Sequence, residues 1–344
     1  HRPMSPENRV FQDVDPATIT APMPFAVGLF GYTGTGKTVS ALRLARGIQR
    51  VYGGDIFFAD TDNGRGLHYR KNFDFRYIDF RPPHNALDFA KLLQSYEGKR
   101  GVLVIDQMTE EHEGEGGLID THEDAKQGKD SRTAMAWGVA KAQHKILART
   151  LKRVMASIPV IVCWRAQKKL DWSHKNDRGK TEPKALGEMP IGSIDLPFEM
   201  TATFLLPPGA NGAPCIAPEL DGEKMMTKIP SFFRPLFHPG DALSEEHGER
   251  MAAWAMGSAA ATFGPVATDL KEQIDRASDE ATIAAIGTSL RTAARARTIT
   301  PAEMKALSEA GAAKKAALES ARQRPPSDPP AEMSPATRQP GEDG

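Results

Sequence analysis

The chain has 344 residues, and its 44 lysines and arginines balance 44 aspartates and glutamates. A neutral chain is not attracted as a whole to nucleic acid or to a membrane surface, so any polyanion must be bound by a local patch. The length allows one large domain and a smaller appendage. The two cysteines, Cys163 and Cys215, exclude a disulfide framework and favour a reducing, cytoplasmic location. No apolar run approaches the ~18 residues of a membrane span, and no signal-peptide pattern opens the chain, so we expect no membrane association.

The first 22 residues are polar and contain several prolines, which predicts an arm lying on the domain that follows. An apolar run from Phe25 to Phe30 then precedes a glycine-rich segment and a helical pattern. The glycine-rich segment fills the pattern G-x-x-x-x-G-K-[ST] with Gly31, Tyr32, Thr33, Gly34, Thr35, Gly36, Lys37 and Thr38. In such a strand, loop and helix, backbone N–H groups and the helix N-terminus bind phosphates. We therefore predict a site for ATP, in which Lys37 contacts the β- and γ-phosphates and Thr38 binds Mg²⁺.

Strands and helices alternate along the rest of this domain. Apolar runs predict buried strands at 55–60, 75–80, 102–106, 159–164 and 200–206. A helix capped by Asn85 and a long amphipathic helix from Ser131 to about Ser157 are expected between them. The alternation predicts an α/β domain over residues 23–240, with a mostly parallel sheet and helices on both faces. A β-hairpin addition is expected within 207–238, with strands near 213–217 and 224–229.

Carboxylates at the ends of two predicted strands would complete the nucleotide site. Asp106 ends an apolar strand 69 residues after Lys37, which is the Walker B arrangement, and would hold Mg²⁺ beside Thr38. Hydrolysis also needs a group that orients and deprotonates water. Asp60-Thr61-Asp62 and the pair Glu110 and Glu111 both offer such a group, although each of these acids also fits a solvated loop.

The segment 110–124 carries His112, His122 and seven acidic residues. These side chains have the atoms of a metal site, but they lack a fixed ligand spacing. A solvated acidic loop is therefore the favoured interpretation of this segment.

The segment 165–184 has an excess of positive charge, with seven lysines and arginines against three acids. Trp172 and Gly179 lie among its polar residues, and no apolar periodicity is present. This pattern predicts a mobile loop that leaves a strand end on the ligand-binding side of the sheet. Cations with an aromatic ring suit single-stranded nucleic acid, through phosphate contacts and base stacking, and the same composition fits an ordinary solvated loop equally well. The residues predicted to contact DNA are Lys168, Lys169, Trp172, Lys175, Arg178 and Lys180.

After a linker or helix at 241–265, the composition changes to alanine-rich helix over 266–323. Thr300-Pro301-Ala302-Glu303 is a capping box with proline at the first helical position, and it predicts a helix running to about Arg322. An apolar stripe on the preceding helix, formed by Ile283, Ile286 and Leu290, predicts a bundle of two or three helices. Residues 324–344 are rich in proline and polar residues and are expected to be disordered.

The order of these motifs resembles the RecA-like core of phage-encoded ATPases, particularly the small single-strand-annealing recombinases distantly related to RecA and RadA. The shared order, over roughly residues 24–235, is Walker A, a strand ending in acid, Walker B, a long helix with Trp137-Gly138, a strand ending in polar residues and a basic loop. The resemblance implies a RecA-like P-loop NTPase fold that binds ATP and Mg²⁺ in the cytoplasm of a bacterial host. It also implies assembly into rings or filaments, in which Lys224 and Lys228 would reach the nucleotide of a neighbouring subunit.

The resemblance further implies roles for single residues. In RecA-like proteins the second strand ends Asp-x-Glu, and the glutamate is the catalytic base. Asp62 would take that role here, with a shorter side chain, which puts efficient hydrolysis in question. The polar sensor of the family falls near Arg165 or Gln167, and its DNA-binding loop falls on about 168–190.

Three functions remain open at this stage. The first is an ATP-hydrolysing DNA-recombination or single-strand-annealing protein that binds single-stranded DNA, with a phage single-strand-binding protein or a helicase as candidate partners. The second is a helicase-loader-like accessory ATPase, in which ATP gates a contact between proteins. The third is a small-molecule kinase in which the 165–184 segment acts as a lid. The length and basic excess of that segment suit a polymer better than a small substrate.

Overall fold

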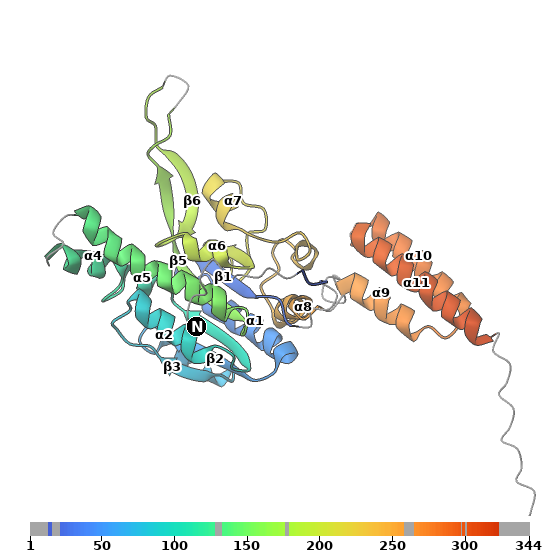
Figure 1. Ribbon diagram of the computed structural model, residues 1–344. Coiled ribbons are helices and arrows are strands. Elements are labelled where there is room, and N and C mark those ends of the chain that lie inside the picture. The colour runs from blue at the N-terminus through green and yellow to red at the C-terminus, as the bar shows by residue number, and fades with distance from the viewer. Residues whose placement is uncertain are drawn as a thin grey trace, which may run out of the picture. The chain divides into compact units, whose positions relative to one another are not determined.

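The computed structural model of the protein describes residues 13–15, 21–127, 133–175, 179–257, 265–296, 298–299 and 301–322. The chain divides into two compact units, His1–Phe263 and Gly264–Gly344, which are described separately (Figure 1). Among the residues so described, no helix is both long enough and apolar enough to cross a membrane.

The first unit is built on a seven-stranded sheet. Its strands are β1 (Ala26–Gly31), β2 (Asp55–Asp60), β3 (Arg76–Asp79), β4 (Gly101–Asp106), β5 (Val160–Asp171), β6 (Lys184–Pro190) and β7 (Ala202–Leu206). Six of them lie in the order β3-β2-β4-β5-β1-β7 and pair in parallel, and β6 pairs antiparallel with the far end of β5. The predicted RecA-like P-loop fold, with its mostly parallel sheet, is confirmed.

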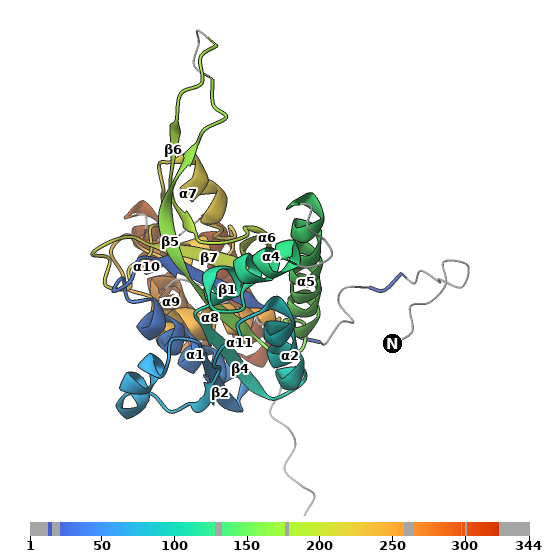
Figure 2. The same cartoon turned by 90° about the vertical axis from the view of Figure 1, so that its left-hand side faces the viewer.

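Helices cover both faces of this sheet. The helices of the first unit are α1 (Lys37–Tyr52), α2 (Ala86–Tyr96), α3 (Glu110–Glu113), α4 (Leu118–Gln127), α5 (Thr133–Val154), α6 (Asp195–Glu199), α7 (Asp221–Met226) and α8 (Glu245–Ala255). One core cluster packs α1 and α8 against the sheet, and a second packs α2 and α5 against the other face (Figure 2). As predicted, the Asn85 side chain caps α2 by accepting the Asp88 N–H at 2.9 Å. β1, β4 and β7 are nearly fully buried because both faces of the sheet are covered.

The closest helix pair in the unit, α1 with α8, depends on two glycines. A Cβ atom at Gly47 would overlap the Glu245 carbonyl oxygen, and one at Gly248 would overlap the Leu44 carbonyl oxygen. The two backbones therefore meet without side chains between them. Ion pairs from Arg43 to Glu245 at 2.9 Å and from Arg50 to Glu249 at 3.1 Å flank the contact. Residues 241–265, expected as a linker or helix, thus include a helix that belongs to the core of the first unit.

The prediction of a β-hairpin within residues 207–238 is wrong. Residues 221–226 form helix α7, and the segment near 215 contributes only an isolated bridge from Cys215 to Leu205. The Lys228 ammonium group donates to the Met200 carbonyl at 2.7 Å, so it is engaged within its own chain. The hairpin addition of this fold is formed instead by β5 and β6, because β5 continues past the sheet as far as Asp171.

The acidic segment 110–124 is not a solvated loop. It folds into α3 and the start of α4, and Glu111 and His122 are buried there. Within the described part of the chain, no group of three or more His, Cys, Asp and Glu side chains is placed to hold a metal ion. Composition alone was misleading here, because burial of single charged residues depends on partners from distant helices.

The second unit contains α9 (Pro265–Arg276), α10 (Glu280–Arg295) and α11 (Pro301–Arg322) among its described residues. Ile274, Ile286, Leu290 and Leu307 are buried between them, so the expected bundle is formed by three helices. Residue 300, at the N-cap of the expected capping box, lies outside the described residues, and so do residues 323–344, which include the expected disordered tail.

We predict that Gly248→Ala lowers the free energy of unfolding of the first unit by about 1–3 kcal/mol, because the added methyl group meets the backbone of α1. Gly138→Ala is the matched control, since Gly138 lies within α5 with no atom within 4 Å of its Cβ position. The control is expected to stabilise by roughly 0.5–1 kcal/mol through helix propensity. Urea unfolding followed by circular dichroism measures both, and equal effects of the two substitutions would contradict the close contact.

Candidate nucleotide-binding site

The glycine-rich loop lies between the end of β1 and the first turn of α1. Gly34 and Gly36 have φ angles of 83° and 94°, which glycine adopts without strain. No side chain caps α1, so the first N–H groups of the helix remain available to an anion. Of the eight loop residues, Thr33, Gly34, Gly36, Lys37 and Thr38 line a cavity of about 260 Å³.

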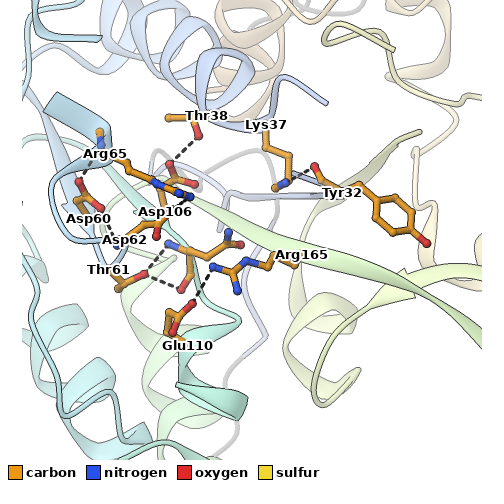
Figure 3. A network of polar contacts seen from close by, with 12 residues as sticks. Tyr32, Lys37, Thr38, Asp60, Thr61, Asp62, Arg65, Asp106, Glu110 and Arg165 are labelled. Atoms are coloured by element: carbon orange, nitrogen blue, oxygen red, sulfur yellow. Dashed lines mark hydrogen bonds and ion pairs between the residues drawn. The ribbon is translucent and has the colours of Figure 1, made fainter. Parts of the chain in front are cut away.

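Three loop residues, Gly31, Tyr32 and Thr35, do not line the cavity but form hydrogen bonds or carbonyl contacts that shape the loop. The Lys37 ammonium group donates to the carbonyl oxygens of Gly31 at 2.9 Å and Tyr32 at 2.7 Å. The Thr35 hydroxyl also donates to the Tyr32 carbonyl, at 2.9 Å, and the Tyr32 ring points away from the acids of the site (Figure 3). Burial lowers the pKa of Lys37. A bound phosphate would counter that effect, because an anion favours the charged ammonium group.

The metal-binding residues predicted from the sequence lie in contact. The Thr38 hydroxyl donates to the Asp106 carboxylate at 2.7 Å, although β5 separates the strands that precede them (Figure 3). Burial raises the pKa of Asp106, against the opposing effects of the Thr38 hydrogen bond and the Lys37 charge. A partly buried carboxylate that lines the cavity beside a hydroxyl fits Mg²⁺, which takes few protein ligands and keeps bound phosphate oxygens and waters. These two residues would hold the ion and bring its charge to the phosphates.

The acids at the end of β2 have different environments. Asp60 is buried and accepts hydrogen bonds from the N–H groups of Asp62 at 2.7 Å and Gly66 at 2.8 Å, so it holds the following turn in place. Asp62 is partly exposed, lines the cavity and pairs with Arg65 at 3.0 Å. Both carboxylates line the cavity, and Asp62 is the more exposed of the two.

Arg165 lies on β5 and lines the same cavity. Its guanidinium group pairs with Glu110 at 3.2 Å and with Glu113 at 3.6 Å (Figure 3). Its backbone N–H donates to the Thr109 hydroxyl at 2.8 Å. The predicted sensor is thus held by residues that directly follow the Walker B strand, and Glu110 is engaged with it instead of lining the cavity.

Sequence reasoning missed five further residues of the cavity wall, Arg65, Gly66, His68, Tyr69 and Gln107. The first four lie on a short 3-10 helix, Arg65–Lys71, which follows Asn63 and Gly64 at positive φ angles. The Asn-Gly pair after a strand end was the available signal, since it marks a turn that returns the chain over the sheet edge.

The residues predicted to bind DNA lie on the β5–β6 hairpin, which projects beyond the sheet (Figures 1 and 2). The expected loop over 165–184 is therefore partly a β-ribbon, since β5 runs to Asp171, Lys175 and Thr181 form an isolated bridge, and β6 begins at Lys184. Lys168 and Lys169 lie on β5, Trp172 is 67% exposed at its end, and Lys175 and Lys180 lie near the tip. Arg178 lies outside the described residues. We call residues 166–190 the arm, a name that from here on does not refer to the N-terminal segment 1–22.

The glycine-rich loop lies within the part of the chain that is similar to a known family. Residues 23–188 match a family model described as an AAA domain. This region is similar to AAA-type P-loop domains. A solved structure of a KaiC-like protein from the archaeon Pyrococcus horikoshii OT3 is similar at 16% identity and a TM-score of 0.26, covering 50% of this chain and 89% of that one. A search of curated proteins finds no match.

We predict that Lys37→Ala weakens ATP binding by about 10- to 100-fold, because charge-assisted hydrogen bonds to phosphate are lost. Lys91→Ala is the control, since Lys91 is an exposed lysine of α2 paired only with Asp88. Titration calorimetry measures the affinity, and circular dichroism checks that both variants are folded. Equal ATP affinity and turnover in Lys37→Ala and the unsubstituted protein would contradict the nucleotide assignment.

We predict that Asp106→Asn retains some ATP affinity and loses Mg²⁺-dependent hydrolysis, because the neutral amide no longer attracts the cation.

Asp62→Asn is expected to lower turnover by roughly 100-fold or more if its carboxylate orients water. Glu110→Gln is the comparison, since that acid holds Arg165 at the edge of the site. Phosphate release as a function of Mg²⁺ separates these cases. Normal turnover in Asp62→Asn with loss in Glu110→Gln would reverse the assignment of the base.

Proposed function

We propose that the protein is a Mg²⁺-dependent ATPase that binds single-stranded DNA along the arm and acts in DNA recombination or strand annealing. The observation that carries this proposal is the path of one strand. β5 passes the cavity at Arg165 and continues without interruption into the arm as far as Asp171. A ligand of the cavity and a ligand of the arm would therefore contact the same strand.

The arm carries cations that are available to a polyanion. Lys168 is exposed opposite Glu188, and neither Lys169 nor Lys175 forms an ion pair with any described residue. Burial lowers the pKa of Lys169, an effect that phosphate contact would counter. In contrast, Lys184 is neutralised by Asp221 at 2.6 Å. The available positive charge is therefore concentrated toward the middle and tip of the arm.

An aromatic ring accompanies these charges. Trp172 is 67% exposed where β5 ends, and Leu170 is 48% exposed two residues before it. Large apolar side chains at the end of a projecting ribbon have little to pack against in their own chain. Base stacking on an exposed ring, with phosphates on neighbouring lysines, is how proteins bind single strands without sequence preference.

The position of the arm also bears on the other two functions, a small-molecule kinase and a helicase-loader-like protein. A small-molecule kinase needs a second substrate beside the γ-phosphate, whereas the predicted lid is a ribbon that projects beyond the sheet (Figure 2). A helicase-loader-like protein would use the arm as a protein contact, and Trp172 and Leu170 suit that use as well. Binding to DNA therefore decides between the first two functions.

We predict that the protein binds an oligothymidine strand with an affinity that falls steeply with salt, each contacted phosphate adding about −0.7 to the log–log slope. Alanine at Lys168, Lys169, Lys175 and Lys180 together is expected to reduce the slope by about two units or more. Trp172→Ala is expected to lose about 1–3 kcal/mol with little change in slope. Fluorescence anisotropy at several salt concentrations measures these quantities.

The matched control is the double variant Lys184→Gln with Asp221→Asn, which removes a paired charge from the arm without changing net charge. It is expected to keep the original slope, and ATP binding is expected to survive all of these substitutions. A protein that has no affinity for single strands at low salt, with or without ATP, would contradict the proposal and favour the helicase-loader alternative.

A further inference from the structure

A second cavity, of about 400 Å³, lies beside helix α5 and shares no lining residue with the nucleotide cavity. Helix α5 contributes four of its residues, and the rest come from α3, α4 and the segment that follows the arm. The lining residues are His112, Leu118, Trp137, Lys141, His144, Lys145, Gly192, Ser193 and Asp195. Its volume is within the range of small-molecule sites.

One of the lining residues is a buried histidine with a ring nitrogen that has no hydrogen-bond partner among the described residues. His144 is 5% exposed, and its Nδ1 lies 2.9 Å from the carboxylate of Glu111, which is 2% exposed. Because a carboxylate accepts, Nδ1 carries the proton and donates. The other nitrogen, Nε2, is buried and makes no hydrogen bond, and its nearest charge is the Asp195 carboxylate at 3.9 Å.

The charge of His144 favours an anion at that position. Burial lowers its pKa, but the hydrogen bond and charge of Glu111, together with the charge of Asp195, outweigh burial and raise it. Lys141 and Lys145 from α5, and His112 from α3, are the other titratable groups around the imidazole. The imidazolium form donates from both nitrogens, so Nε2–H is a donor that no described residue satisfies.

One face of α5 adds two cations and an aromatic ring. Trp137, Lys141 and Lys145 recur every four residues and therefore lie one above another along the helix. Neither lysine forms an ion pair with a described residue, so two like charges stand together without compensation. The Trp137 ring stacks on buried His122, with centroids 3.9 Å apart and planes at 21°. His122 does not line the cavity, so it holds the ring from the far side.

We propose that this cavity binds a phosphomonoester that carries an aromatic base, either a free mononucleotide or the phosphorylated end of a nucleic-acid strand. The phosphate accepts hydrogen bonds from His144 Nε2 and from Lys141 and Lys145, and the base lies against Trp137. Asp195 is the one acid lining the cavity, and its side chain is 69% exposed and able to turn toward solvent. This site is separate from the proposed DNA contact on the arm and does not depend on it.

The test uses full-length Lys37→Ala protein, so that binding at the glycine-rich loop does not mask the second site. Titration calorimetry with AMP is expected to show one binding event. The affinity for AMP is expected to be at least tenfold weaker in the variant that carries both Lys141→Ala and Lys145→Ala. Arg149→Ala is the control, because Arg149 is the next cation on that helix face and does not line the cavity. Asp195→Asn is expected to tighten binding about three- to tenfold, a gain that misfolding cannot produce.

Adenosine and inorganic phosphate are the probes for the two halves of the ligand. Both are expected to bind at least tenfold more weakly than AMP, and Trp137→Leu is expected to bring AMP to the level of phosphate. A 5′-phosphorylated dinucleotide tests the source. If the dinucleotide binds about as tightly as AMP, the cavity is assigned to strand ends. If the dinucleotide does not bind, the cavity is assigned to free mononucleotides. Equal binding of adenosine and AMP, or no response to the Lys141, Lys145 and Asp195 substitutions, would overturn the proposal.

Discussion

The 2.7 Å contact between Thr38 and Asp106 is the interaction around which the first unit is arranged. It requires β1 and β4 to end at the same sheet edge with β5 between them, and parallel pairing through β5 provides this alignment. A partly buried carboxylate is stabilised by a hydrogen bond or a cation, so the contact both positions the two residues predicted to hold Mg²⁺ and stabilises the edge. The glycine-rich loop, the turn at Asp60 and the 3-10 helix all meet at this edge.

Helix α3 joins the nucleotide cavity to the second cavity through neighbouring side chains. Glu110 holds Arg165 at 3.2 Å, on the strand that becomes the arm, and Glu111 holds His144 at 2.9 Å. Helix α3 begins only a few residues after the Walker B strand ends at Asp106, so both glutamates lie close to that residue along the chain. The arm, the nucleotide cavity and the second cavity are therefore linked by one strand and one helical turn, which gives a physical route by which their ligands could influence one another.

Much of the nucleotide site was determined by the sequence itself. The loop 31–38, the strand ending in Asp106, the cap at Asn85 and the parallel α/β architecture depend on local chemistry: glycine at positive φ angles, apolar runs of strand length and a side chain that accepts an N–H group. These properties act over a few residues, so they can be read without knowing what packs nearby. The choice of Asp62 over Asp60 came from a family pattern and stays a prediction, since both aspartates line the cavity.

Tertiary structure alone decided which charged residues are buried and where the ribbon lies. Segment 110–124 has the composition of a solvated loop, yet Glu111 and His122 are buried because His144 and Trp137 on α5 pack against them. The basic segment 165–184 lacks periodicity, yet β5 continues through it because β6 supplies backbone hydrogen bonds from the other side. The segment near 224 forms a helix where a strand was expected, and it packs on β6. In each case the deciding partner lies on another helix or strand. The composition of a segment carries no information about which element will pack against it.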